Sequence, residues 1–84
     1  MAEQLVGTVT HYFGKPQVGI VRITEGGVRV GDTIHVLGAH SDFTMKIGSM
    51  ELDHNAVESA DVGAEVGIKM TEKAREHDRV YLVG

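Results

Sequence analysis

Gly14 and Lys15 are the first residues whose types suggest chemistry, because a glycine followed by a lysine ends the phosphate-binding loop of many nucleotide-hydrolysing proteins. That loop follows the pattern G-x-x-x-x-G-K-[ST], which requires glycine at position 9 and a hydroxyl at position 16. Val9 and Pro16 occupy these positions. The pair therefore indicates a hairpin turn, and we expect this chain neither to bind nor to hydrolyse GTP by itself.

Histidines are the remaining candidates for a metal site, because the chain contains no cysteine. None of the histidines pair at the spacings that place two ligands on one face of a helix or strand. The five are His11, His35, His40, His54 and His77. We interpret them as surface or hydrogen-bonded side chains, and we predict no bound metal.

Serine and carboxylate side chains do not form a recognisable catalytic pattern either. Ser49 follows Gly48, but the framing glycines of a Gly-x-Ser-x-Gly nucleophile elbow are missing. The carboxylates are dispersed in expected corners, where aspartate commonly stabilises turns. Those aspartates are Asp32, Asp42, Asp61 and Asp78. We therefore predict no catalytic residue, no cofactor and no enzymatic activity.

A small contact surface is predicted at the tip of the first hairpin. Its aromatic side chains are able to stack on a ligand, and its lysine is able to meet a phosphate or a carboxylate. The alternative is that the two aromatic residues pack against the end of the core, as aromatics usually do. The predicted partner-binding residues are His11, Tyr12, Phe13 and Lys15, with Arg22 and Arg29 as secondary candidates.

The elements that would position these residues are short strands. Alternating β-branched, aliphatic and aromatic residues predict strands over residues 5–13, 17–24, 33–37, 42–52, 65–70 and 79–83. Both faces of the second strand are largely apolar, which indicates a central position. Residues 53–61 are expected to be turn-like, and this segment and residues 71–78 each have a composition compatible with one helical turn.

Residues 25–38 organise this pattern, because they contain a glycine pair, a Val-Arg-Val run, a Gly-Asp corner and an alternating strand. A weaker echo follows 32 positions later, where Val62 and Gly63 again precede an aliphatic strand. Two such corners in a short chain predict a curved sheet that closes on itself. The fold expected is all-β, a small closed antiparallel Greek-key barrel of six or seven strands.

Length and composition limit the remaining possibilities. The 84 residues predict a single domain over residues 1–84, and a hydrophobic fraction of 42% is sufficient for a core. The formal charge of −4 argues against non-specific binding of nucleic acid through bulk charge. No apolar run approaches the roughly 20 residues that span a bilayer, and residues 1–6 do not resemble a signal peptide. A cytoplasmic protein without membrane contact is therefore expected.

The ordered motifs resemble the second domain of translation GTPases, the β-barrel of elongation factor Tu and its relatives. The resemblance covers roughly residues 5–83, and its segments are residues 18–23, 26–34, 47–51 and 57–68. A closer similarity is to small translation elongation factor-like proteins. The Thr-His-Tyr-Phe start at residues 10–13 is also similar to the C-terminal barrel of collagenase-like peptidases.

This resemblance implies a barrel that lacks the GTPase domain of those factors. The leading hypothesis is a non-catalytic, translation elongation factor-like binding module whose partner is the ribosome, RNA or another translation component. The alternative is an accessory protein–protein interaction module for a peptidase-like or other enzyme. Fold alone does not decide between them, because function resides in the site.

Overall fold

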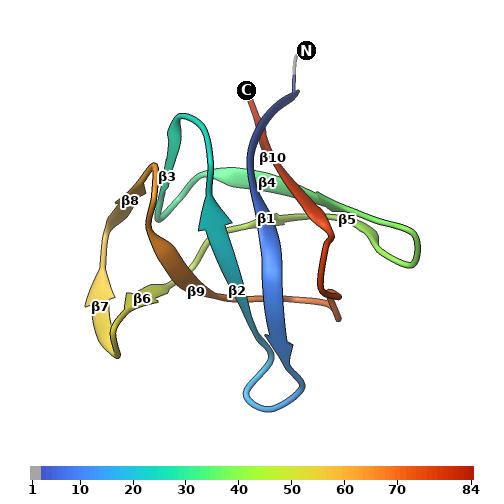
Figure 1. The fold of residues 1–84 in the computed structure, drawn as a ribbon, viewed down its shortest axis with the longest axis horizontal. Coiled ribbons are helices and arrows are strands. Elements are labelled where there is room, and N and C mark those ends of the chain that lie inside the picture. The colour runs from blue at the N-terminus through green and yellow to red at the C-terminus, as the bar shows by residue number, and fades with distance from the viewer. Residues whose placement is uncertain (1–2) are drawn as a thin grey trace.

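The computed structural model describes residues 3–84, which form ten β-strands joined by turns (Figure 1). The strands are β1 (Glu3–Phe13), β2 (Val18–Ile23), β3 (Gly27–Arg29), β4 (Thr33–Leu37), β5 (Asp42–Lys46), β6 (Met50–Leu52), β7 (Asn55–Val57), β8 (Ser59–Asp61), β9 (Glu65–Lys69) and β10 (Arg79–Val83). Residues 1 and 2, which belong to the single domain predicted over residues 1–84, lie outside the described residues. No helix within residues 3–84 is long and apolar enough to cross a membrane.

All strand pairs are antiparallel, and they form two sheets. Eight strands follow the order β5-β4-β10-β1-β2-β9-β6-β7, while β3 pairs only with β8 among the described residues. The start of β1 lies beside the end of β10, with Glu3 paired to Val83 (Figure 1). The all-β prediction is thus confirmed. The closed barrel of six or seven strands is not confirmed, because within residues 3–84 the two outer strands of the large sheet do not pair with each other.

Two irregularities in β1 change which of its side chains face the core. The register shifts between Leu5 and Gly7 in the pairing with β10, and between Val9 and His11 in the pairing with β2. A β-bulge inserts one residue, so it reverses the alternation of the faces. Val6 and Val9 are therefore both fully buried although three positions separate them. The simple alternation predicted for residues 5–13 is wrong for this reason.

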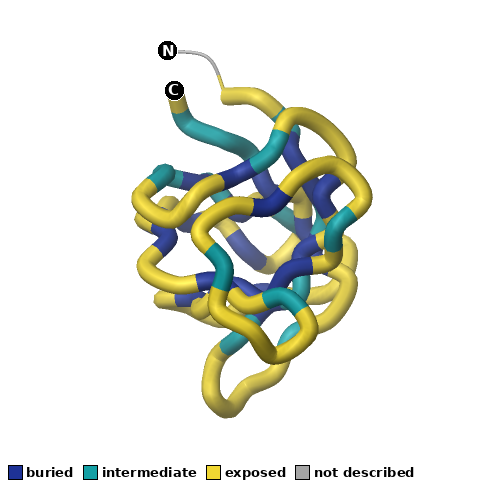
Figure 2. The backbone as a smooth tube through the Cα atoms, turned by 90° about the vertical axis from the view of Figure 1, so that its left-hand side faces the viewer, coloured by how far each residue is buried: buried dark blue, intermediate teal, exposed yellow. Residues whose placement is uncertain are grey.

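The core is one cluster of aliphatic and methionine side chains supplied by both sheets. The large sheet contributes residues such as Val21, Ile34 and Val66, and the small sheet contributes Val28 and Ala60. Figure 2 shows the buried segments crossing the middle of the molecule while exposed turns surround them. Burial of these apolar side chains is the main favourable term in folding.

Three four-residue corners precede three of the five-residue strands. Residues 29–32 lead into β4, residues 61–64 into β9 and residues 75–78 into β10. In each corner the backbone N–H of the fourth residue donates to the carbonyl of the first, over 3.0, 3.1 and 3.2 Å respectively. The third residue has positive φ: 99° at Gly31, 94° at Gly63 and 75° at His77. This is the φ that a type II turn requires at its third position.

Three segments differ from the elements expected. The long strand predicted over residues 42–52 is interrupted between β5 and β6, where Ile47 turns inward and its N–H donates to Asp32. The predicted helical turn in residues 53–61 is wrong, because β7 and β8 occupy that segment. The helical turn expected in residues 71–78 is also absent from this described part of the chain, which contains bends and the third corner.

Candidate functional site

A hollow lies on the outer face of β2, β9 and β6, and we call it the outer groove. Its volume is about 470 Å³. Its floor is formed by apolar residues and one glycine: Phe13, Pro16, Val18, Ile20 and Gly67. Its rim carries the polar residues Glu51, Asp53, His54 and Glu65. Clefts of this size that combine an apolar surface with a few polar groups are typical binding sites.

Strand register explains why these residues meet. His11 pairs with Ile20, Ile20 with Gly67, and Gly67 with Glu51, so these four form one row across four strands. Residues that are directly opposite on antiparallel strands share a face of the sheet. Phe13, Val18 and Lys69 form the next row. The groove therefore follows from the pairing of β1, β2, β9 and β6, and not from a loop.

Gly67 keeps the centre of the floor open. A Cβ atom at this position would lie 3.2 Å from Cγ1 of Val18 and 3.5 Å from Cδ1 of Ile20. Any side chain there would occupy the space between β2 and β6. The hollow thus depends on the absence of a side chain at one buried position of β9.

A tight turn forms the acidic end of the rim. Asp53 and His54 connect β6 to β7, with φ angles of 51° and 66°, and Leu52 pairs with Asn55 across them. A two-residue hairpin with two positive φ angles is a type I′ turn, which favours Asn-Gly over other sequences. Non-glycine residues in this conformation are uncommon and often occur where a side chain has a role.

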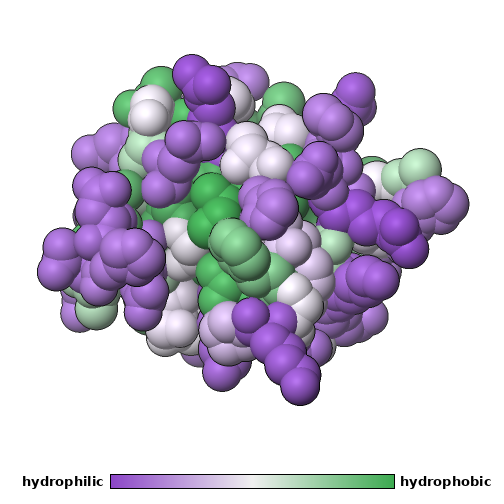
Figure 3. Space-filling model, turned by 60° about the horizontal axis from the view of Figure 1, so that its bottom comes forward, coloured by the Kyte–Doolittle hydropathy of each residue, from purple (hydrophilic) through white to green (hydrophobic). Residues whose placement is uncertain are grey.

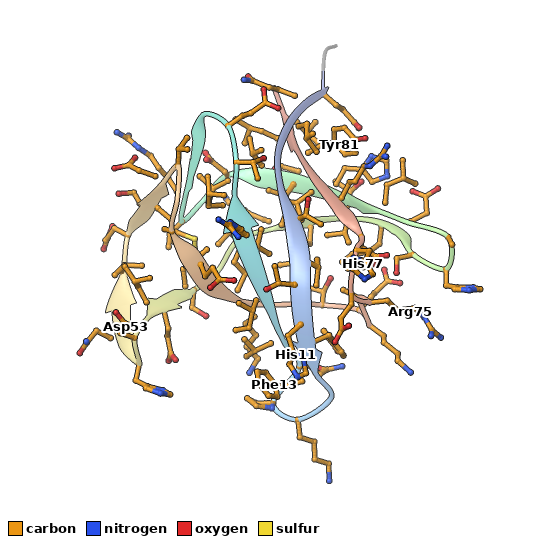
Figure 4. All side chains as sticks on the ribbon, in the orientation of Figure 1. His11, Phe13, Asp53, Arg75, His77 and Tyr81 are labelled. Carbon is orange, nitrogen blue, oxygen red and sulfur yellow. The ribbon has the colours of Figure 1, made fainter. Side chains whose placement is uncertain are left out.

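His11 and Phe13 are brought together, as predicted for the hairpin surface. Their ring centroids lie 4.4 Å apart in an edge-on arrangement, and Figure 4 shows both side chains at the lower end of β1. Phe13 is 47% exposed and lines the groove. Nδ1 of His11 lies 3.2 Å from Oε2 of Glu76, and both side chains are more than half exposed.

Tyr12 and Lys15 have different surroundings. Tyr12 is half-buried and packs against the core, so the alternative of aromatic packing applies to Tyr12 and not to Phe13. Lys15 is exposed in the turn between β1 and β2. Neither residue lines the outer groove. Pro16, which is also in that turn, does line it.

The two secondary candidates are separated by the fold. Arg22 pairs with Glu65, which places it next to the groove. Arg29 belongs to β3 and pairs with Ser59 in the small sheet, far from the hairpin at the lower end of β1 (Figure 1). It lines a separate hollow of about 280 Å³ beside β8. The structure thus does not bring Arg29 into one surface with His11 and Phe13.

A charged cluster that the sequence did not predict lies at the opposite end of β1. Nδ1 of His35 lies 2.8 Å from Glu3 Oε1, and its Nε2 lies 2.6 Å from Asp42 Oδ1. Both ring nitrogens face carboxylates, which only accept hydrogen bonds, so the doubly protonated imidazolium satisfies the arrangement. The hydrogen bonds with Glu3 and then Asp42 raise the pKa of His35 above its usual value of 6.5, against a smaller opposing effect of desolvation.

Within residues 3–84, no group of three or more histidine, aspartate or glutamate side chains is arranged so that it could hold a metal ion. The cluster around His35 joins the paired strands β4 and β5 to Glu3 of β1, which is 32 positions from His35, and no short motif signals it. The sequence did not predict the groove either, because its residues come from several strands. The two apolar faces of β2 were interpreted as a sign of a central position, and β2 does lie between β1 and β9, but Val18 and Ile20 on its outer face remain partly exposed.

Comparison with known proteins finds a protease that is similar in sequence and peptidase domains that are similar in fold. No protein-family model matches the chain. The chain is 33% identical over 79 residues to an uncharacterized protease of Methanocaldococcus jannaschii. The alignment covers 93% of this chain but 19% of the protease, so the chain spans about a fifth of that relative.

Two solved structures share the fold. Both are crystal structures of the C-terminal domain of a putative U32 peptidase from Geobacillus thermoleovorans. The native form superimposes with a TM-score of 0.88 at 18% identity, covering 96% of this chain and 93% of that domain. The selenomethionine variant gives 0.85 at 19% identity, covering 92% and 96% respectively.

These similarities correct the leading hypothesis from the sequence. The assignment to translation, to the ribosome and to elongation factor-like proteins is wrong, because the similar proteins are a protease and the C-terminal domain of a putative peptidase. The motifs quoted for translation GTPases describe strands and corners, which different proteins with related architectures are able to share. By its fold, the chain resembles the C-terminal domain of a putative U32 peptidase.

Proposed function

We propose that this chain is a protein-binding module that acts as an accessory to a peptidase-like protein and has no catalytic activity of its own. The observation that carries the proposal is the alignment with the archaeal protease, which includes 93% of this chain and 19% of the protease. The similarity is thus to about a fifth of the protease. The C-terminal position of the similar peptidase domain supports the same role.

The proposal is tested by affinity purification from cells that express the chain naturally, with and without nuclease treatment. We expect a peptidase-like protein to be recovered in both samples. Recovery of other proteins without any peptidase-like protein would contradict the proposal. A complex that disappears after nuclease treatment would contradict it as well, because such a complex would depend on nucleic acid.

The absence of catalysis needs a separate measurement. The purified chain is incubated with a protease substrate such as casein, alone and together with the recovered peptidase-like protein. We expect no cleavage by the chain alone, and a change in the rate or the substrate preference of the peptidase when the chain is added. Cleavage by the chain alone would contradict the non-catalytic assignment.

The contact surface is proposed to include the hairpin residues predicted from the sequence, His11, Tyr12, Phe13 and Lys15, with Arg22 beside them. Support comes from the exposure of Phe13 and Lys15 and from the contact between His11 and Phe13. Replacing Phe13 and Lys15 together by alanine should weaken recovery of the partner. Lys46→Ala is the matched control, because Lys46 is an exposed lysine on β5, outside this face.

We further propose that residues 1–84 act as one folding unit in which the two sheets close around the core like a barrel. The single cluster of buried residues contributed by both sheets supports this organisation. So does the backbone hydrogen bond of 2.8 Å from the N–H of Gly31, in the corner after β3, to the carbonyl of Ile47, which follows β5 of the large sheet.

A further inference from the structure

We infer that the outer groove binds an extended segment of a partner protein that presents a bulky apolar side chain and, two residues away, a lysine or arginine. The inference deepens the proposed function, because this segment would belong to the peptidase-like partner. Its chemistry is argued from the groove itself. The apolar end of the groove selects the bulky apolar side chain, and the acidic end selects the lysine or arginine. The distance between the two ends sets the spacing of these residues in the segment.

The apolar requirement comes from the hairpin end of the groove. Phe13 is 47% exposed, and Val18 and Ile20 are only partly buried, although all three are large hydrophobic residues. Figure 3 shows a hydrophobic area on the lower face of the molecule, surrounded by hydrophilic side chains. With Gly67 leaving the floor open, the volume of about 470 Å³ accommodates a leucine-sized or larger side chain.

The cationic requirement comes from the other end. Glu51, Asp53 and Glu65 contribute three carboxylates to the rim, and within residues 3–84 none of the three forms an ion pair. Two cations border the groove without closing it. Arg22 is the strand neighbour of Glu65, and Lys69 lines an adjoining hollow with Glu51. The lining itself is thus negative, and a positively charged ligand complements it.

The two ends are separated by the width of the sheet. Asp53 follows Glu51 by two residues on a strand antiparallel to β9, which places it toward Glu65 and away from Phe13. Figure 4 shows Asp53 and Phe13 on two different hairpins. Adjacent strands lie about 4.8 Å apart, and an extended chain rises about 3.3 Å per residue. If the partner segment places an apolar side chain against β2, a long cationic side chain two residues further along the segment is therefore able to reach β6. Residues two positions apart in an extended chain lie on the same face.

The test is a titration of the whole ¹⁵N-labelled chain with capped peptides, followed by NMR. The first peptide is Gly-Ser-Leu-Ser-Arg-Ser-Gly, and two control peptides replace its leucine by serine or its arginine by glutamate. We expect saturable shifts at the amides of Ile20, Gly67 and Glu51 with the first peptide. Both controls should bind at least about tenfold more weakly. Equal shifts with all three peptides, or none at these amides, would overturn the inference.

Variants identify the groups responsible. Glu51→Gln combined with Glu65→Gln should raise the Kd of the first peptide by about tenfold, since exposed charge pairs contribute modestly. Added salt should reduce this difference. Glu25→Gln is the matched control, because Glu25 is exposed in the turn before β3 and does not line the groove. An unchanged Kd in the double variant would overturn the role of the carboxylates.

The apolar end has its own pair of variants. Gly67→Ala places a Cβ atom in the floor of the groove, where Val18 has to move slightly. Phe13→Ala removes an exposed side chain that is not part of the buried core. Both should raise the Kd of the first peptide, and Phe13→Ala should do so with an unaltered melting temperature. A folded Phe13→Ala variant that binds the peptide normally would overturn the apolar part of the inference.

Failure of this inference and failure of the proposed function give different results. If the double variant Glu51→Gln and Glu65→Gln still recovers the peptidase-like partner in full, the groove assignment is wrong and the accessory function stands. If the peptide binds the groove but no peptidase-like protein is recovered from cells, the groove assignment stands and the accessory function is wrong.

Discussion

At the scale of single residues, Gly38 and Asp78 restrict each other. Asp78 is 3% exposed, and its Oδ2 accepts a hydrogen bond of 2.9 Å from the backbone N–H of Arg75. A Cβ on Gly38 would collide with Oδ1 of the same carboxylate. The carboxylate cannot move away without losing that hydrogen bond. The glycine is therefore required by the space that Asp78 occupies, not by its own backbone angle.

Gly38→Ala is accordingly expected to destabilise the chain by about 1–3 kcal/mol, the usual cost of overpacking a filled site. Gly48→Ala is the control, because nothing lies within 4 Å of a Cβ at that position. We expect the control to change the free energy of unfolding by less than about 0.5 kcal/mol. Urea denaturation of both variants measures the difference, and equal stability of the two would contradict the account of Gly38.

The charged cluster around His35 predicts a pH dependence of stability. The hydrogen bonds with Glu3 and Asp42 raise the pKa of His35 in the folded state, so the folded chain binds its proton more tightly than the unfolded chain. The resulting stabilisation is fully present below the unfolded pKa of about 6.5 and is lost as the pH rises through the higher folded pKa. Glu3 is 40% and Asp42 73% exposed, so the effect should stay below about 1 kcal/mol.

The measurement compares urea denaturation of the natural chain and of His35→Gln from mildly acidic to mildly alkaline pH. We expect the stability difference between them to shrink as the pH rises. His40→Gln is the control, since His40 is exposed in the loop before β5. If the natural chain and His35→Gln differ by the same free energy at every pH, the proton on His35 does not contribute.

At the scale of elements, the three corners show which features are readable from sequence. The corners at residues 29–32 and 61–64 were recognised as an echo because both contain a Val-Gly pair. The third corner was missed because His77 occupies the position of the glycine, although its φ of 75° is similar. The first and third corners also share an aspartate whose Oδ2 accepts the N–H of the residue three positions earlier, over 2.9 Å in both.

His77→Gly should therefore stabilise the chain by about 0.5–1 kcal/mol. A non-glycine residue with positive φ costs about 1–3 kcal/mol, and the greater freedom of glycine in the unfolded chain offsets part of the gain. Gly63→Ala tests the same conformation in reverse, because its φ is 94° and nothing lies within 4 Å of an added Cβ. Thermal unfolding of both variants checks this. A destabilised His77→Gly would show that the histidine side chain contributes more than its backbone costs.

The strands themselves were largely predictable. Residues 33–37 and 79–83 were expected as strands, and they are the bounds observed for β4 and β10. Alternation was lost where a bulge intervenes, as between Val9 and His11, because an inserted residue leaves no signature in composition. The short strands β7 and β8 were missed for another reason. Their three residues each are too few to display a period of two.

At the scale of the whole molecule, the sequence predicted an all-β fold but not the groove. The groove combines residues from β1, β2, β6 and β9 and from two hairpin turns, which are brought together only by the strand order. Phe13 was selected from its type and its position in a hairpin. No sequence pattern marks Gly67 or Glu65 as a groove residue. They line the groove because Gly67 pairs with Ile20 and Glu51, and Glu65 pairs with Arg22, on neighbouring strands.

The same arrangement predicts that the small sheet unfolds together with the large one. Val28 of β3 and Ala60 of β8 are 2% and 5% exposed and belong to the core cluster that β2, β4 and β9 share. Separating β3 and β8 would expose that cluster, so the small sheet has no independent hydrophobic contact to retain. Native-state hydrogen exchange should therefore give the slowest amides of β3 and β8 the same opening free energy as those of β2 and β9.

Val28→Ala sharpens this test, because truncating a buried valine should cost about 1–3 kcal/mol and lower the opening free energy of both sheets equally. Val62→Ala is the control, because Val62 is 58% exposed and does not belong to the core cluster. If Val28→Ala lowers protection in β3 and β8 alone, the small sheet is a separate cooperative unit. In that case the groove on β2, β9 and β6 would retain its shape when the small sheet opens, and peptide binding would leave the exchange of β3 and β8 unchanged.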